Sequence, residues 1–232
     1  MQRARGESAE ARQALGELCE AYWNPVFRFL RGQGRDEESA RELTQEFFAR
    51  LLAGRGLQGA EPGRGRFRSY LLGALKHFLA DWRDHTQRLK RGGGVELAPL
   101  EVPGGTDTAP ALQVPDPAAM PDDRVFDQAW ALAVMERALR ALQEEYARQD
   151  KSHHFELLKP WLQGETPGLS QAETAACLGM NESALKVAIH RLRKRFREAV
   201  RAELAQTVAT EAEVDVELRY LVEVLAQGPR QA

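Results

Sequence analysis

The sequence predicts an all-α protein with two small helical domains, a glycine- and proline-rich linker between them, and a C-terminal helix. Apolar residues recur at helical spacing along most of the chain, and no segment shows the apolar–polar alternation of a half-buried strand. One stretch between the helical blocks contains too much glycine and proline to hold a helix or a central strand. Cations and carboxylates are also segregated along the chain, although the formal net charge is only −2.

The first helical block extends from about residue 7 to residue 87, with glycine-rich breaks at 31–36 and 53–66. Its apolar residues lie on one stripe of each helix, so we expect three or more helices that share a core. Trp82 fits a core position and a contact with DNA equally well. The apolar stripes contain Leu15, Leu18, Tyr22, Val26, Phe29, Ala40, Leu43, Phe47, Phe48, Leu51, Leu52, Tyr70, Leu71, Leu75, Phe78, Leu79 and Trp82.

The predicted linker covers residues 92–121, which include five glycines and six prolines. About 30 residues of flexible chain have an r.m.s. span of roughly 30 Å, and an extended length of about 100 Å. That reach would allow two domains to bind separate stretches of one duplex. The second helical block begins near Asp122, whose carboxylate is a candidate N-cap.

Charge is concentrated in three segments. Residues 64–91 carry eight cations against two carboxylates, and residues 181–201 carry seven cations against two. Residues 203–227 instead carry six carboxylates and one cation. Two separate basic segments indicate two contacts with one polyanion.

The acidic segment is predicted to form the C-terminal helix. The apolar side of this helix contains Val214, Leu218, Leu221, Val222 and Leu225. Two interpretations remain open: the helix packs as an ordinary C-terminal helix, or it folds back onto a basic surface or the first domain and holds the chain closed.

A helix-turn-helix pattern precedes the second basic segment. Ser170 and Glu173 form a capping box, which predicts a helix start. This helix ends at Gly179, because glycine adopts the left-handed conformation at little cost. Asn181 is a suitable N-cap for the next helix, and Ala175 provides the small residue where the two helices cross.

The second helix of this pattern separates apolar from cationic side chains. Leu185, Ile189, Leu192, Phe196 and Val200 form a buried stripe. Another face begins at the N-terminal end, where recognition helices contact base edges, and becomes more basic towards positions suited to phosphates. The alternative is a solvated basic helix that packs on its neighbours. The candidate DNA-binding residues are Glu182, Ser183, Lys186, Val187, His190, Arg191, Arg193, Lys194 and Arg197.

The order of these segments resembles a known protein family. Residues 18–53 (LCEAYWNPVFRFLRGQGRDEESARELTQEFFARLLA) look like the polymerase-binding helix pair of a bacterial sigma factor, and ARELTQEFF is the most characteristic part. Residues 67–91 (FRSYLLGALKHFLADWRDHTQRLKR) are similar to the segment that melts the promoter and reads its minus-10 element. The helix-turn-helix resembles the module that reads the minus-35 element. The resemblance is to the extracytoplasmic-function group of the sigma-70 family, and it covers both blocks in the family's order.

This resemblance implies a sigma factor that binds core RNA polymerase and directs promoter recognition and DNA melting. It implies a domain 2-like bundle at 1–91, the linker at 92–121, a domain 4-like helix-turn-helix at 122–204, and an acidic extension at 205–232. The implied partners are promoter DNA and the β′ clamp helices and β flap of the polymerase, and the family allows an anti-sigma factor. The implied polymerase contacts are Leu43, Thr44, Gln45, Glu46 and Phe47.

For melting, cations would follow the phosphates of one strand while an aromatic surface holds an unstacked base. Lys76 and His77 stand where the family often has an arginine–asparagine pair, and Glu42 replaces a common aspartate. Val187 and Ala188 stand where a serine–arginine pair is frequent. The missing arginine removes a guanine contact of about 1–3 kcal/mol, so we expect an atypical minus-35 sequence. The candidate minus-10 and melting residues are Arg66, Arg68, Lys76, His77, Trp82, Arg83 and Arg88.

Other functions explain less of the sequence. A helix-turn-helix regulator that binds an operator without joining the polymerase explains the second block only. A helical adaptor for acidic proteins would explain the basic faces without DNA binding. An enzyme is the weakest alternative, because there is no phosphate-binding glycine loop and no metal-ligand spacing. His153 and His154 are adjacent and read as loop residues, so no metal or cofactor is expected.

The cellular location is predicted to be the cytoplasm. The N-terminal residues lack the apolar core of a signal peptide, and no apolar run is long enough to span a membrane. Cys19 and Cys177 each lie within an apolar helical pattern. Both are predicted to be buried free thiols, as in a reducing compartment.

Overall fold

The structure is a computed structural model of the chain. It describes residues 9–53, 66–90, 123–163 and 168–228, without the side chains of 9–15, 87–90 and 163. The regular structure within these ranges is entirely helical, with no strand, which confirms the predicted all-α class. The helices are α1 (Ala9–Arg31), α2 (Glu37–Ala53), α3 (Phe67–Lys90), α4 (Asp123–Arg148), α5 (Ser152–Leu158), α6 (Pro160–Gln163), α7 (Gln171–Cys177), α8 (Glu182–Ala205) and α9 (Glu211–Ala226).

Helix boundaries agree with the predicted ones where the chain is described. A turn separates α1 from α2 at the first predicted break, and α4 begins at Asp123. Residues 54–65, the predicted linker at 92–121 and the proposed cap Asp122 lie outside the described residues. The prediction that His153 and His154 lie in a loop was wrong. Both residues occupy the first turn of α5, which begins at Ser152.

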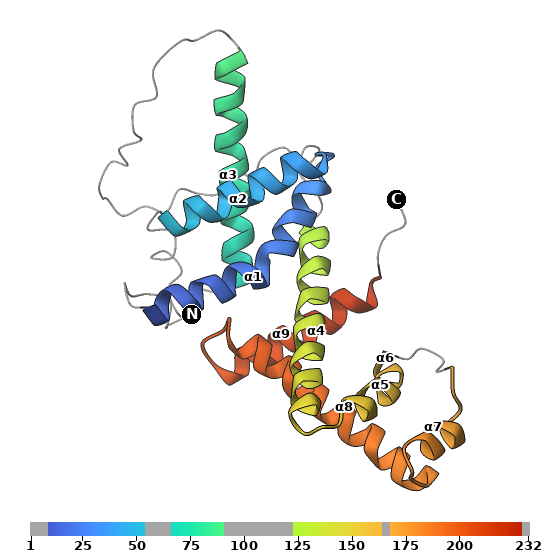
Figure 1. The fold of residues 1–232 in the computed structure, drawn as a ribbon. Coiled ribbons are helices and arrows are strands. Elements are labelled where there is room, and N and C mark those ends of the chain that lie inside the picture. The colour runs from blue at the N-terminus through green and yellow to red at the C-terminus, as the bar shows by residue number, and fades with distance from the viewer. Residues whose placement is uncertain (1–8, 54–65, 91–122, 164–167, 229–232) are drawn as a thin grey trace.

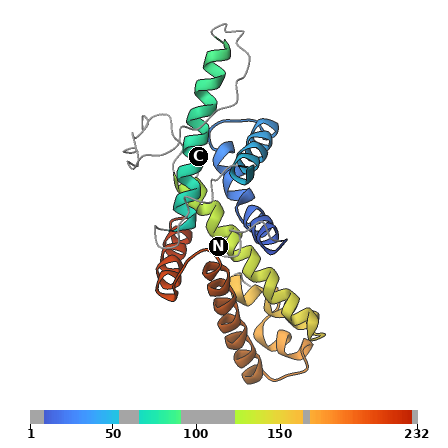
Figure 2. The ribbon, with the colours of Figure 1, turned by 90° about the vertical axis from the view of Figure 1, so that its left-hand side faces the viewer.

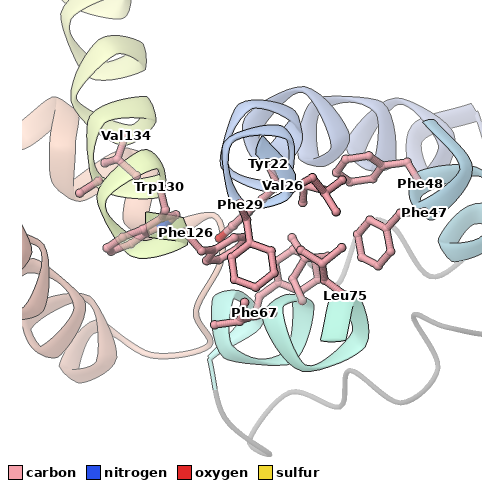
Figure 3. Close-up of a cluster of buried hydrophobic side chains, with 14 of the residues drawn as sticks. Tyr22, Val26, Phe29, Phe47, Phe48, Phe67, Leu75, Phe126, Trp130 and Val134 are labelled. Carbon is pink, nitrogen blue, oxygen red and sulfur yellow. The ribbon is translucent and has the colours of Figure 1, made fainter. Parts of the chain in front are cut away.

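The main hydrophobic core joins helices from both blocks. In Figure 3, side chains of α1, α2, α3 and α4 meet in one continuous cluster. Phe126 of α4 is fully buried, and its ring meets that of Phe29 of α1 edge-on at 6.2 Å between centroids. Trp130 is 2% exposed in the same cluster. The start of the second block therefore completes the core of the first.

The C-terminal half of α8 and helix α9 extend the same core. Val200 and Leu204 of α8 and Val214, Leu221 and Val224 of α9 all belong to it. The interior of the predicted domain at 122–204 is thus divided between two cores. Its outer part forms a second cluster around Leu142, Tyr146, Phe155, Leu158, Ala175, Leu185, Ile189 and Leu192.

The molecule is elongated in both ribbon views. The C-terminal half of α3 and the short helix α7 lie at opposite ends (Figures 1 and 2). Helices α4 and α8 run side by side between these ends, and α9 folds back across α4 below the start of α3. The N-terminal part of α8 and the C-terminal half of α3 therefore lie towards opposite ends of the molecule, whereas Arg201 and Arg66, at the near ends of the two basic segments, both pair with α9.

Most predicted core positions are buried, with exceptions at the edges of the apolar stripes. Leu52 is 47% exposed and Val222 is 57% exposed, so both predictions were wrong. On α9, Glu217 occupies the buried position that the pattern assigned to the neighbouring Leu218, which is only partly buried. The side chain of Leu15 lies outside the described residues.

The two cysteines are free thiols, as predicted, but neither is fully buried. Cys19 is half-buried and burial raises its pKa, whereas Cys177 is exposed at the end of α7. The prediction of burial for Cys177 was wrong because α7 is only two turns long and packs through another face. Among the described helices, none is long and apolar enough to cross a membrane.

Candidate nucleic-acid interface

The first helix of the helix-turn-helix, α7, has the start and the end that the sequence predicts. The Ser170 hydroxyl accepts from the backbone N–H of Glu173 at 3.2 Å, and the Glu173 carboxylate accepts from the Ser170 N–H at 2.8 Å. Gly179 has φ +63°, and the following N–H, of Met180, donates to the carbonyl of Ala175 at 2.9 Å. This is a Schellman ending, in which glycine adopts the left-handed conformation that other residues avoid.

The next helix begins at its predicted cap, and the two helices cross at a small residue. The Asn181 side chain accepts from the backbone N–H of Ala184 at 2.8 Å. Ala175 is 2% exposed, and Leu185 and Leu192 are fully buried beside it in the second cluster. A larger side chain at Ala175 would push α7 away from α8, which is why the pattern requires a small residue here.

The predicted recognition face of α8 is open to solvent. All nine candidate residues from Glu182 to Arg197 are exposed. Arg193 differs from the others, because its guanidinium donates to the backbone carbonyl of Trp161 at 2.9 Å and 3.2 Å. Arg193 therefore positions α6 against α8, whereas Lys194 makes only a surface contact of 3.9 Å with Glu198. The structure brings these candidates together on one helix.

The cations at the start of α3 have a different environment. Arg68 was predicted to contact DNA, but its side chain is 7% exposed and forms ion pairs with Asp127 of α4 and Glu217 of α9. Arg66 pairs with the same Glu217 at 2.8 Å between Nε and Oε1. Arg68 is closed to a phosphate in this conformation, whereas Arg66 is 34% exposed and pairs with Glu217 through Nε.

Aromatic side chains complete this buried network. The guanidinium carbon of Arg68 lies 4.3 Å from the ring centroid of Tyr220 and 4.8 Å from that of Trp130. The Tyr220 hydroxyl donates to Asp127 at 2.6 Å. Burial tends to lower the pKa of Arg68, but the Asp127 and Glu217 carboxylates outweigh it and the pKa is raised. Arg68 is therefore a buried charge that joins α3, α4 and α9, although its Nε, 3.5 Å from Glu217, makes no hydrogen bond.

The remaining candidates on α3 are more accessible than Arg68. Lys76 is half-buried and pairs with Asp123 at 2.7 Å, whereas His77 is exposed. Arg83 is half-buried and donates to the Gln33 side chain at 3.2 Å. The side chain of Arg88 lies outside the described residues. Among the described candidates, Arg68 is therefore inaccessible, Arg66, Lys76 and Arg83 are partly exposed and already have partners, and His77 is exposed.

The predicted polymerase-binding run on α2 is mostly internal. Leu43, Thr44 and Phe47 are at most 4% exposed, and the Thr44 hydroxyl donates to a carbonyl of its own helix at 2.7 Å. Gln45 is exposed, and Glu46 is half-buried and pairs with Arg50 at 2.5 Å. Only Gln45 and Glu46 can therefore meet a partner through their side chains in this structure.

No family model matches this chain. No curated protein and no solved structure matches it either. Within the described residues, no cluster of histidine, cysteine and acidic side chains could hold a metal ion. The functional inference therefore depends on the residues and geometry of this chain.

Sequence reasoning missed the carboxylates that neutralise α3. Asp127 and Glu217 are 6% and 2% exposed, although both residue types are normally at the surface. Arg137 of α4 was also missed; it pairs with Glu203 at 2.7 Å and donates to the Ala21 carbonyl at 3.1 Å. The burial of Glu217 could have been predicted, because it lies three residues after Val214 and four before Leu221, within the apolar stripe.

Proposed function

We propose that the chain is a sigma factor, which binds core RNA polymerase and directs promoter recognition and DNA melting at initiation. The observation that carries the proposal is the exposed cationic face of α8, which follows a capped helix-turn-helix turn. The resemblance of ARELTQEFF and of the α3 segment to sigma factors supports the polymerase-binding part. The alternative function is a helix-turn-helix regulator that binds an operator without joining the polymerase.

The experiment combines the purified chain with core polymerase and genomic DNA and sequences the 5′ ends of the transcripts. A sigma factor gives discrete starts that share sequence elements upstream. An operator-binding regulator gives protein–DNA complexes but no association with core polymerase and no new starts, and that result would reject the proposal.

Replacing Arg191 with alanine is expected to weaken binding to the recovered minus-35 DNA. Arg191 is exposed on the recognition face, and one lost phosphate or base contact costs about 1–3 kcal/mol, or roughly 5- to 150-fold in affinity. Arg140→Ala is the matched control, because Arg140 is exposed on α4 outside this face. Fluorescence anisotropy at several salt concentrations gives both the affinity and the salt dependence. Equal affinities for the two variants would remove α8 from the interface.

The position of α9 bears on the proposal that the acidic extension holds the free protein closed. Helix α9 packs into the shared core, as an ordinary C-terminal helix does, and Glu217 also pairs with Arg68 of α3 and with Arg66 just before it. The packing of α9 agrees with the first interpretation, and the pairing of Glu217 with Arg66 and Arg68 supports the second as a proposal with a specific consequence. In that proposal, Glu217 competes with a DNA strand for Arg66 and Arg68.

Replacing Glu217 with glutamine is expected to tighten binding of single-stranded DNA by about tenfold, within the usual range of such couplings. Glutamine keeps the shape and an acceptor oxygen, and Arg68 keeps its pair with Asp127. Glu223→Gln is the control, because it removes the same charge from an exposed position of α9. A gain that is equal in both variants would reflect net charge alone and would contradict the masking role.

A further inference from the structure

Three arginines converge where the α1–α2 turn meets the C-terminal half of α3. The guanidinium carbon of Arg35 lies 4.4 Å from the ring centroid of Trp82. The next residue, Arg83, donates to the Gln33 side chain at 3.2 Å. Arg31 at the end of α1 donates to the backbone carbonyl of Arg35 at 2.9 Å. Guanidinium groups from two separate elements therefore share one small region.

No carboxylate pairs with these arginines in the described part of the chain. The nearby Asp36 instead caps α2, accepting from the Ser39 N–H at 2.8 Å and from its hydroxyl at 2.7 Å. The pKa of Arg35 is lowered by burial and by the charge of Arg83, and Asp36 only partly opposes this. Like charges are thus held close together in a partly desolvated place, which costs stability.

Two buried donors in the same region have no acceptor. They are Nε of Arg35 and Nε2 of Gln33. Buried polar groups are nearly always hydrogen-bonded, and an unpaired donor beside uncompensated positive charge is the expected state of an anion site without its anion. A phosphate would supply the missing charge, and a small shift of the side chains that cover the two buried donors would bring an oxygen to them.

We propose that Gln33, Arg35 and Arg83 bind one backbone phosphate of a nucleic-acid strand, with Arg31 at the rim of the site. Trp82 is a positioning residue: its ring holds the Arg35 guanidinium in place and is covered by it. This assigns a contact to the α1–α2 turn, and it gives Trp82 a different role from cradling a base. The identity of the strand as promoter DNA depends on the proposed function, whereas the phosphate chemistry does not.

The position of this site makes it an early contact for the strand. It lies along the part of α3 that extends away from α9 (Figures 1 and 2), whereas Arg66 and Arg68 at the start of α3 are neutralised by Glu217. A strand can therefore bind Arg35 and Arg83 without any change in the packing of α9.

The test uses the full chain and a fluorescein-labelled oligo(dT) of about 20 nucleotides, a length that covers a typical single-strand site. Arg35→Gln and Arg83→Gln are each expected to weaken binding about five- to tenfold and to make the salt slope shallower by about 0.7. Arg140→Gln, with the same charge change on exposed α4, is the control and should bind as the wild type does. Gln variants that bind like the control would overturn the proposal.

Stability gives a second readout that distinguishes binding from a structural role. Removal of the Arg35 charge relieves repulsion from Arg83, so Arg35→Gln should melt at the same temperature as the wild type or higher while it binds more weakly. A variant that loses both stability and affinity would indicate a structural arginine and would count against the site. If Arg35→Gln fails to fold, Arg35→Lys is measured in its place. Lysine keeps the positive charge but lacks the planar guanidinium, so weaker binding with an unchanged salt slope is expected.

Trp82 is tested through its dependence on Arg35. Trp82→Leu should weaken oligo(dT) binding in the wild type but not in the Arg35→Gln background, because the ring acts only through that guanidinium. Equal losses in the two backgrounds would show that Trp82 contacts the strand directly and would overturn its assignment. A chain that binds oligo(dT) through Arg35 but never associates with core polymerase would refute the sigma-factor proposal and leave this site intact.

Discussion

Replacing Arg68 with methionine is expected to lower the free energy of unfolding by about 3–5 kcal/mol. Methionine fills a similar volume, but it leaves the carboxylates of Asp127 and Glu217 facing each other at 8% and 2% side-chain exposure. Arg66 still pairs with Glu217 and Tyr220 still donates to Asp127, so neither carboxylate loses all its partners. The loss arises because an uncompensated negative charge remains buried between α3, α4 and α9.

Arg201→Met is the matched control. Arg201 also pairs with two carboxylates, Glu211 and Asp215, but these are 87% and 55% exposed. Water screens such pairs, so the loss of Arg201 should cost far less than the loss of Arg68. Urea unfolding of both variants, followed by circular dichroism, makes the comparison. Similar losses for the two variants would mean that the Arg68 network is open to water in solution.

Replacing Phe126 with alanine should also cost about 3–5 kcal/mol, because a fully buried aromatic side chain leaves a cavity that its neighbours fill only partly. The location of the effect is as informative as its size. Phe126 belongs to α4, yet its ring packs on Phe29 of α1. If the two blocks share one core, the variant should loosen α1 as well as α4.

Hydrogen exchange tests this directly, since backbone amides of α1 should exchange faster in Phe126→Ala than in the wild type. Leu132→Ala is the control on the same helix, because Leu132 is 45% exposed and should cost well under 1 kcal/mol. Faster exchange in α4 with no change in α1 would show that the blocks fold as the independent domains that the sequence predicts.

Local patterns were sufficient wherever a few neighbouring residues determine the structure. The capping box at Ser170, the left-handed Gly179 and the cap at Asn181 were all predicted and are all observed. The exposed cationic face of α8 follows from the same patterns, because a helix with one buried stripe must expose the opposite side. For these features the relevant contacts lie within one or two turns of helix.

The accessible cations of α3 could not be predicted in this way. Arg66, Arg68 and Arg83 belong to one basic segment, but the first two are neutralised by residues about 60 to 150 positions farther along the chain, a separation on which periodicity gives no information. Arg35 was overlooked for the same reason, since only folding brings it over Trp82.

The helical class, several helix boundaries and the apolar face of most helices follow from the residue pattern. What those faces pack against follows only from the folded arrangement. This arrangement placed α4 and α9 on the first block rather than in a separate domain, and so it decided which arginines remain available to a ligand. The reason is physical: an apolar stripe specifies that a helix must be covered, but hydrophobic burial is non-directional and does not specify the partner.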